Sequence, residues 1–336
     1  MVRGQRALVG TFCLGASVVP LTVGAGAATA VPARPSAGCA LPGSVSPGTS
    51  NILLAAGGDN GAYVREVPPS YAGHVPTPVV IDLHGYGEPA SLQVLLTALG
   101  TYGDTHGFIT ITPQVASPVP DWDPSLGGKD LAFFGGLMRA IDSTLCVDRN
   151  RIFVTGYSDG AFMASAIACQ FAGQVAAVAP IAGIDDPKGC HPSRPVPMVA
   201  FHGTADGFVP YTGGLGPSAL KLPAPDGSKK TIGQLVPAGS PLLAGPSVPA
   251  ATAGWAKRNG CAPAPKLSTV APDVTLIEYR CPRRADVELY RINGGGHAWP
   301  GSVFSKGIQS IVGKVTSSIS ANQIMWDFFR AHPLRH

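Results

Sequence analysis

The chain has 336 residues, of which 45% are hydrophobic and 13% charged, with 43 glycines and 33 prolines. This balance excludes a disordered or coiled-coil protein and is typical of a loop-rich globular one. The formal net charge is only +4, and the basic pairs at residues 229–230 and 283–284 stand alone, so we expect no nucleic-acid partner.

The first thirty residues are typical of a secretory signal peptide. Arg3 and Arg6 supply a positive start, an apolar stretch spans residues 7–23, and residues 28–30 (Ala-Thr-Ala) form a small-residue cleavage site. Pro20 interrupts the apolar stretch, which argues against an uncleaved membrane anchor. We therefore predict cleavage after residue 30, a secreted extracellular protein, and no stable membrane insertion after signal cleavage.

Cysteine usage agrees with export. Six cysteines remain once Cys13 leaves with the signal: Cys39, Cys146, Cys169, Cys190, Cys261 and Cys281. An even number of cysteines in an exported chain predicts disulfides. Local order favours two short-range pairs, 169 with 190 and 261 with 281, which would leave 39 for 146, although other pairings stay open. No two of them have the Cys-x-x-Cys spacing of a zinc or redox site.

Strand and helix patterns alternate along the rest of the chain. Residues 31–50 are rich in Pro, Gly, Ala and Ser and predict a flexible lead-in, which Cys39 would staple to the body. Short apolar runs then predict strands at residues 78–83, 108–112, 152–155, 175–181, 196–201, 274–279 and 287–292. Helical spacing predicts helices at residues 91–99, 130–145, 161–171, 249–260 and 321–329. This alternation implies an α/β fold in one domain, with a mostly parallel central sheet and helices on both faces.

Residues 211–246 break this alternation. The segment is rich in Gly and Pro with scattered Leu. A structureless stretch of this length inside a domain is often functional. We expect a long surface loop that is either a lid beside the site or a passive insertion.

The strongest chemical motif is Gly-x-Ser-x-Gly at residues 156–160. It lies between a predicted strand and a predicted helix, where such a Ser stands on a sharp strand-to-helix turn. Small residues on either side let the turn pack closely, and the N-terminus of the following helix favours developing negative charge. We therefore predict that Ser158 is the catalytic nucleophile.

A serine nucleophile needs a base and an orienting acid, which follow it in the order acid, then His. His297 comes directly after the last predicted strand, behind three glycines, and is the predicted base. Asp206 follows the strand at 196–201 and is the favoured acid. Asp185 and Asp186, which follow an earlier strand, are the alternatives.

Two backbone N–H groups should bind the oxyanion. Asp159, directly after the nucleophile, is one predicted donor, and Tyr86, in the loop after the strand at 78–83, is the other, with Gly85 as its neighbour. Trp299, beside His297, and Trp122 are candidate substrate-binding walls. The sequence contains no His-Glu-x-x-His, Walker or convincing dinucleotide motif, so we expect no metal and no cofactor.

Several segments match motifs of a known family. They are residues 83–85 (Leu-His-Gly), 156–161, 190–197, 202–206 (His-Gly-Thr-Ala-Asp), 255–261 and 296–301 (Gly-His-Ala-Trp-Pro-Gly). Together they resemble secreted polyhydroxybutyrate depolymerase-like and feruloyl-esterase-like serine esterases of the α/β-hydrolase superfamily. The resemblance implies an α/β-hydrolase catalytic domain at residues 51–336, no cofactor, and hydrolysis of carboxylic esters. It also implies that Ser158, Asp206 and His297 are the nucleophile, acid and base.

The chain departs from that family in two ways. Many relatives have Cys where Tyr86 stands, and polymer-degrading depolymerases append a polymer-binding domain, whereas this chain ends at His336. We therefore expect a small-molecule or oligomeric ester substrate in place of solid polymer. A secreted serine peptidase of the same fold, or a binding protein that kept the fold without catalysis, are the alternatives.

Overall fold

The computed structural model of the protein describes residues 1–2, 31–237 and 239–335. The predicted signal peptide therefore lies outside the described residues, except for Met1 and Val2. Within the described part of the chain, no helix is long and apolar enough to cross a membrane.

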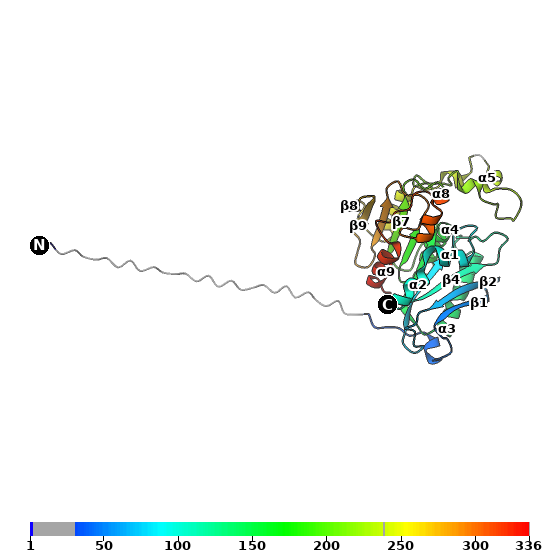
Figure 1. The fold of residues 1–336 in the computed structure, drawn as a ribbon, viewed down its shortest axis with the longest axis horizontal. Coiled ribbons are helices and arrows are strands. Elements are labelled where there is room, and N and C mark those ends of the chain that lie inside the picture. The colour runs from blue at the N-terminus through cyan, green and yellow to red at the C-terminus, as the bar shows by residue number, and fades with distance from the viewer. Residues whose placement is uncertain (3–30, 238, 336) are drawn as a thin grey trace. The chain divides into compact units, whose positions relative to one another are not determined.

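The body is built on one ten-stranded sheet in the described residues, with the order β1-β2-β4-β3-β5-β6-β7-β10-β9-β8 (Figure 1). The six strands from β4 to β10 in this order run parallel. The antiparallel pairs β1–β2 and β8–β9 form its two edges. The strand bounds are β1 Gly48–Ala56, β2 Asp59–Val67, β3 Thr77–Leu83, β4 Ile109–Val115, β5 Val147–Tyr157, β6 Val178–Ile181, β7 Met198–Gly203, β8 Lys266–Ala271, β9 Val274–Tyr279 and β10 Val287–Ile292.

Three of these strands were not predicted from the sequence. The predicted strands correspond to β3, β4, β5, β6, β7, β9 and β10, whereas β1, β2 and β8 lie at the sheet edges. Each of the three carries exposed or half-exposed residues along most of its length. Central parallel strands are buried on both faces and appear as continuous apolar runs, whereas half-exposed edge strands lack that signal.

Helices cover both faces of the sheet. The longer ones are α1 Ala90–Thr97, α2 Leu99–His106, α3 Lys129–Thr144, α4 Asp159–Gln170, α6 Val248–Arg258 and α9 Ala321–Ala331, and the short ones are α5 Ile232–Leu235, α7 Val303–Gly307 and α8 Gln309–Val312. The helix predicted at 91–99 is two helices, since Ala98 has a left-handed φ of 49° that separates α1 from α2.

Alternate residues of the central strands point to opposite faces of the sheet and pack in two separate hydrophobic cores. Val79 and Ile81 of β3 pack with buried residues of α3, α4 and α6. Val80 between them points to the other face, where it joins buried residues of α1, α2 and α9. This period of two, with both faces apolar, explains why the whole of β3 is buried.

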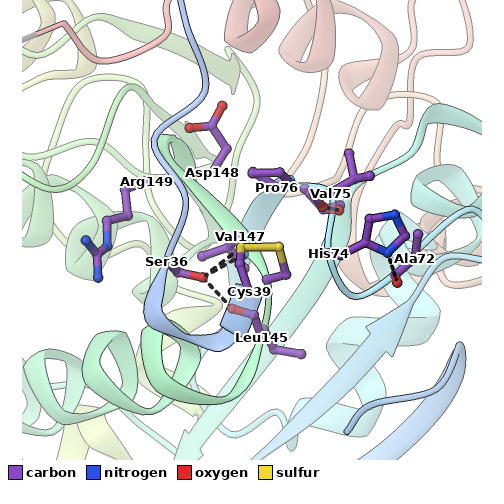
Figure 2. Close-up of a disulfide and its surroundings, with 12 residues drawn as sticks. Ser36, Cys39, Ala72, His74, Val75, Pro76, Leu145, Val147, Asp148 and Arg149 are labelled. Atoms are coloured by element: carbon purple, nitrogen blue, oxygen red, sulfur yellow. Dashed lines mark hydrogen bonds between the residues drawn. A yellow bond between two sulfur atoms is a disulfide. The ribbon is translucent and has the colours of Figure 1, made fainter. Parts of the chain in front are cut away.

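The lead-in at residues 31–50 is attached to the body more firmly than expected (Figure 2). The Ser36 hydroxyl donates to the Leu145 carbonyl at 2.5 Å and accepts from the Val147 N–H at 2.9 Å. Cys39 forms a disulfide with Cys146, the residue between those two partners. The lead-in also contains the start of β1, so the expectation of a flexible segment ending at residue 50 differs from the structure.

All six cysteines of the described residues are paired as local order favoured. The disulfides are Cys39–Cys146, Cys169–Cys190 and Cys261–Cys281. Their sequence separations are 107, 21 and 20 residues. A longer closed loop restricts the unfolded chain more, so the first disulfide should stabilise the fold most.

We expect the double substitution Cys39→Ala/Cys146→Ala to lower the free energy of unfolding by about 4–5 kcal/mol, against about 3 kcal/mol for the matched control Cys261→Ala/Cys281→Ala. Equilibrium urea unfolding, followed by fluorescence and circular dichroism, measures both. A greater loss in the control pair would contradict this ranking.

Candidate active site

Ser158 stands on a strained turn between β5 and α4. Its φ of 56° and ψ of −115° lie outside the helical and extended regions, although it is not a glycine. The flanking glycines allow this turn. A Cβ at Gly156 would lie 2.2 Å from the Gly160 carbonyl oxygen, and one at Gly160 would lie 2.3 Å from that of Leu83. Such strain persists where the surrounding structure holds it, and it presents the hydroxyl clear of the sheet.

His297 and Asp206 complete a hydrogen-bonded chain with Ser158. His297 Nε2 lies 2.9 Å from Ser158 Oγ, and His297 Nδ1 lies 2.7 Å from Asp206 Oδ2. The carboxylate only accepts, so Nδ1 carries the proton and Nε2 accepts from the serine hydroxyl. Asp206 follows β7 and His297 follows β10, which are neighbouring parallel strands whose carboxyl ends meet at one edge of the sheet.

The alternative acids lie elsewhere. Asp185 accepts the backbone N–H of Asp186, and Asp186 forms an ion pair with Arg258 of α6. Neither has a hydrogen bond to His297 in the described part of the chain. The structure therefore brings Asp206, and not these two, to the imidazole.

Asp206 is held as a carboxylate. Its Oδ1 accepts the backbone N–H groups of Phe208 at 2.8 Å and Val209 at 2.9 Å. Burial opposes the charged form, but the interaction with His297 and the hydrogen bonds outweigh it, so the pKa of Asp206 lies below its usual value. The residue is buried, 6% exposed, so these bonds act in a low-dielectric setting.

Two aromatic rings contact the imidazole of His297. The ring of Phe208 stacks on it at a centroid distance of 4.8 Å, and the ring of Tyr157 lies at 4.9 Å. The Tyr157 hydroxyl donates to the His297 carbonyl at 2.6 Å. A Cβ at Gly296 would lie 2.1 Å from the Val312 carbonyl oxygen, which explains why glycine precedes the histidine. The sequence did not identify Tyr157 or Phe208, because neither belongs to a motif position with a known role.

The loop after β3 has three successive backbone N–H groups near the site, at Gly85, Tyr86 and Gly87. Gly85 donates its N–H to the Glu88 carboxylate at 3.3 Å, and Gly87 donates to the Pro120 carbonyl at 2.7 Å. Among the described residues the Tyr86 N–H has no acceptor. Tyr86 and Asp159, whose N–H opens α4, both border the cavity beside Ser158. These two N–H groups are therefore available for an oxyanion, whereas that of Gly85 is engaged.

Neither tryptophan lines that cavity, which corrects their prediction as substrate-binding walls. Trp122 is 5% exposed; its backbone N–H donates to the Asp159 carboxyl and its indole donates to the His84 carbonyl. Trp299 is 1% exposed, and its indole donates to the side chain of Asn322. Both support the site from below because their N–H groups find buried acceptors there.

The cavity beside Ser158 has a volume of about 300 Å³. Phe162 and Val209 line it from the body, and residues 211–246 provide most of the remaining wall, including Leu215, Leu222, Ile232 and Val236. In Figure 1 this segment carries α5. Some of the scattered leucines of this segment therefore line the cavity. Because they follow no helical or strand period, the sequence did not predict this role.

In the described residues, no three His, Cys, Asp or Glu side chains cluster in a way that could hold a metal ion. The groups gathered around Ser158 are a hydroxyl, an imidazole, a carboxylate and two backbone N–H groups.

Comparison with known proteins agrees with this geometry. No family model matches the chain. The chain is 34% identical to feruloyl esterase B of Piromyces equi, over 50% of this chain and 29% of that protein. It is 32% identical to a probable feruloyl esterase C of Aspergillus clavatus, over 44% of this chain and 56% of that protein. It is 30% identical to feruloyl esterase D of Neurospora crassa over 53% of this chain and 63% of that protein. The predicted resemblance to feruloyl esterases is confirmed over about half of the chain, which spans less than two thirds of each relative.

A solved structure extends the likeness to most of the fold. An acetyl xylan esterase from Aspergillus awamori superposes with a TM-score of 0.53 at 18% identity, covering 84% of this chain and 100% of that one. The chain has the α/β-hydrolase fold. The likeness to this structure supports the fold alone, because the identity is low.

Asp82 anchors the strand that leads into the Tyr86 loop. This fully buried carboxyl lies within 2.7 Å of Gln93 Nε2 and of Thr97 Oγ1, both on α1. Burial raises the pKa of Asp82 to about 7, with the hydrogen bonds from Gln93 and Thr97 opposing the shift and nearby Glu66 and Glu88 adding to it. Thr97 Oγ1 also lies 3.1 Å from the Gln93 carbonyl, so it can donate there and accept from a protonated Asp82.

A raised pKa in the folded state predicts a pH-dependent stability. The folded protein binds this proton more tightly than the unfolded chain, so the stabilisation is complete below about pH 4 and is lost as the pH rises to about 7. Asp82→Asn mimics the protonated carboxyl. We expect the stability of Asp82→Asn relative to the wild type to rise by on the order of 4 kcal/mol between pH 4 and pH 8.

Urea unfolding of both proteins at a series of pH values measures this difference. The control Asp82→Ala removes the hydrogen bonds at every pH and should be less stable than Asp82→Asn throughout. A difference between Asp82→Asn and the wild type that does not change with pH would contradict the prediction.

Proposed function

We propose that this chain is a secreted serine esterase that hydrolyses carboxylic esters. The observation that carries the proposal is the continuous hydrogen-bonded chain from Ser158 Oγ through His297 to Asp206, with distances of 2.9 and 2.7 Å. The feruloyl esterases that it resembles support the ester class. The signal-like N-terminal sequence and the three disulfides support export.

In the proposed reaction, Ser158 Oγ attacks the ester carbonyl carbon while His297 Nε2 takes its proton. Asp206 keeps the imidazole in the tautomer that accepts this proton and stabilises the resulting imidazolium. The N–H groups of Asp159 and Tyr86 bind the oxyanion. His297 returns the proton to the departing alcohol, leaving an acyl group on Ser158. Water, deprotonated by His297, then attacks the acyl carbon. The bond from that carbon to Ser158 Oγ breaks, the acid is released, and His297 returns its proton to Ser158 Oγ.

Ser158→Ala removes the nucleophile without enlarging the side chain. We expect the hydrolysis of short p-nitrophenyl esters to fall by about 10⁴-fold or more, since the serine and its base act as one unit. Ser143→Ala, on the exposed surface of α3, is the matched control and should keep wild-type activity.

A fluorophosphonate probe gives a second readout. It should label the wild type and the control at Ser158 and leave Ser158→Ala unlabelled. Full ester turnover by Ser158→Ala would reject the proposal, and peptide turnover above ester turnover would favour the peptidase alternative.

A second histidine, His202, lies beside the proposed catalytic acid Asp206. His202, at the end of β7, is 2% exposed, and its Nε2 lies 2.8 Å from the Val209 carbonyl and 3.4 Å from Asp206 Oδ2. Burial lowers the pKa of His202, although Asp206 and Val209 oppose that shift, so the ring is neutral. Both neighbours are acceptors, so its one proton is on Nε2. This N–H ties the turn at residues 206–209 to the strand and orients the carboxylate.

His202→Leu should lower kcat by roughly 10- to 100-fold with a smaller change in KM, because losing a hydrogen bond near a charged group costs about 1.5–3 kcal/mol. His202→Gln can still donate an N–H and should retain most of the activity. His74→Leu, at an exposed site, is the control. Steady-state kinetics of the three variants measure the effect, and equal losses in the Leu and Gln variants would show that the donated N–H is not the cause.

A further inference from the structure

The cavity beside Ser158 lies on one side of the reacting ester. The departing alcohol must receive its proton from His297 Nε2, so it leaves on the histidine side. The cavity is bordered by Ser158 and by the two proposed oxyanion donors, Asp159 and Tyr86, but His297 itself does not line it. The acyl part of the ester, which stays on Ser158, is therefore the part that occupies the cavity.

Only three of the side chains that line this cavity are polar. Besides Ser158, the described lining residues with polar side chains are Tyr86 and Asp159. The Tyr86 hydroxyl donates to the Pro223 carbonyl at 2.7 Å. The Asp159 carboxyl accepts the Trp122 N–H at 2.8 Å. Its pKa is raised to about 7 by burial, and neighbouring acids add to the shift despite that bond.

The remaining lining side chains are apolar. They include Phe162 and Phe208 from the body, and Leu222, Ile232 and Val236 from residues 211–246. A hydroxyl group on the bound acyl chain that lies against these apolar side chains would lose its water without gaining a hydrogen bond from them, which costs a penalty that an unsubstituted chain avoids. A charged acyl group would be excluded more strongly.

The volume limits the length of the chain. A water molecule takes up about 30 Å³ of the liquid, and a methylene group is of similar size, so a cavity of about 300 Å³ has room for roughly six to ten carbons. We propose that Ser158 is acylated preferentially by unsubstituted aliphatic acyl groups of this length, and that hydroxylated acyl groups are poorer substrates. This inference rests on the proposed esterase function.

The inference separates this chain from both substrate classes that its sequence resemblance suggests. A feruloyl group carries a phenolic hydroxyl and a methoxy group, and a hydroxybutyryl group carries an aliphatic hydroxyl. The lining side chains of residues 211–246 are all apolar and offer these polar groups no hydrogen bond. The Tyr86–Pro223 hydrogen bond matters here because it both engages the Tyr86 hydroxyl and ties the wall segment to the oxyanion loop.

A series of p-nitrophenyl esters, from acetyl to dodecanoyl and below their micelle concentrations, tests the wild type. We expect kcat/KM to rise by up to about fourfold per added methylene until the chain has six to ten carbons, and then to level off or fall. Replacing butyryl by 3-hydroxybutyryl should lower kcat/KM by roughly five- to a hundredfold. A flat or falling series from acetyl onward, or equal turnover of the butyryl and 3-hydroxybutyryl esters, would overturn the inference.

Val236→Thr provides the matched change in the wall, since it adds one hydroxyl at nearly constant volume. It should lower octanoyl turnover and raise 3-hydroxybutyryl turnover relative to the wild type. Val303→Thr makes the same substitution at a site that is 84% exposed and outside the cavity lining, and should change neither. If the two variants behave alike, the wall does not select the acyl group.

Ser158→Ala keeps this test separate from the proposed function. If it abolishes turnover of every ester while the chain-length series is flat, the esterase proposal stands and the acyl inference fails. If it leaves turnover intact, the esterase proposal itself fails.

Discussion

The close approach of the first turn of α4 to the backbone at the end of β3 is the constraint on which the site depends. A Cβ at Gly160 would lie 2.3 Å from the Leu83 carbonyl oxygen, so only glycine lets α4 begin there. That contact puts the first N–H groups of α4 beside the loop that carries Tyr86. It also leaves Ser158 with a φ of 56°, a conformation that the neighbouring segments must maintain. The same contact thus positions Ser158 and the proposed oxyanion donors, Asp159 and Tyr86.

Buried polar groups around the site orient one another through shared hydrogen bonds. Asp206 accepts from His297 and from the backbone of its own turn, while His202 bonds the carbonyl of that turn. Trp122 links the Asp159 carboxyl to the His84 carbonyl beneath the oxyanion loop. Such shared hydrogen bonds hold the participating groups in one arrangement. The proposed catalysis would rely on the fixed arrangement of Ser158, His297 and Asp206 on the sheet. The less regular segment 211–246 supplies the wall that faces the substrate.

Much of the central fold was predictable because its signals are local. Apolar runs marked the central strands β3 to β7, which are mostly buried on both faces. The runs at β9 and β10 were recognisable although they include polar, half-buried residues. The edge strands β1 and β8, and β2 beside β1, were missed because their half-exposed residues resemble loops. The break at Ala98 was missed because alanine rarely adopts a positive φ. The two tryptophans were misplaced because an aromatic residue near a motif carries no information on which side it will be buried.

The sequence by itself determined the strand–turn–helix around Ser158 and the chain order of nucleophile, acid and base. Both follow from short-range requirements, namely small residues at a tight turn and polar residues just after buried strands. Only the tertiary structure decided that Asp206, and not Asp185 or Asp186, reaches His297, that the Gly85 N–H is engaged by Glu88, and that residues 211–246 form the cavity wall. These outcomes depend on which distant segments pack together, and a hydrogen bond or an apolar wall exists only once both partners are in place.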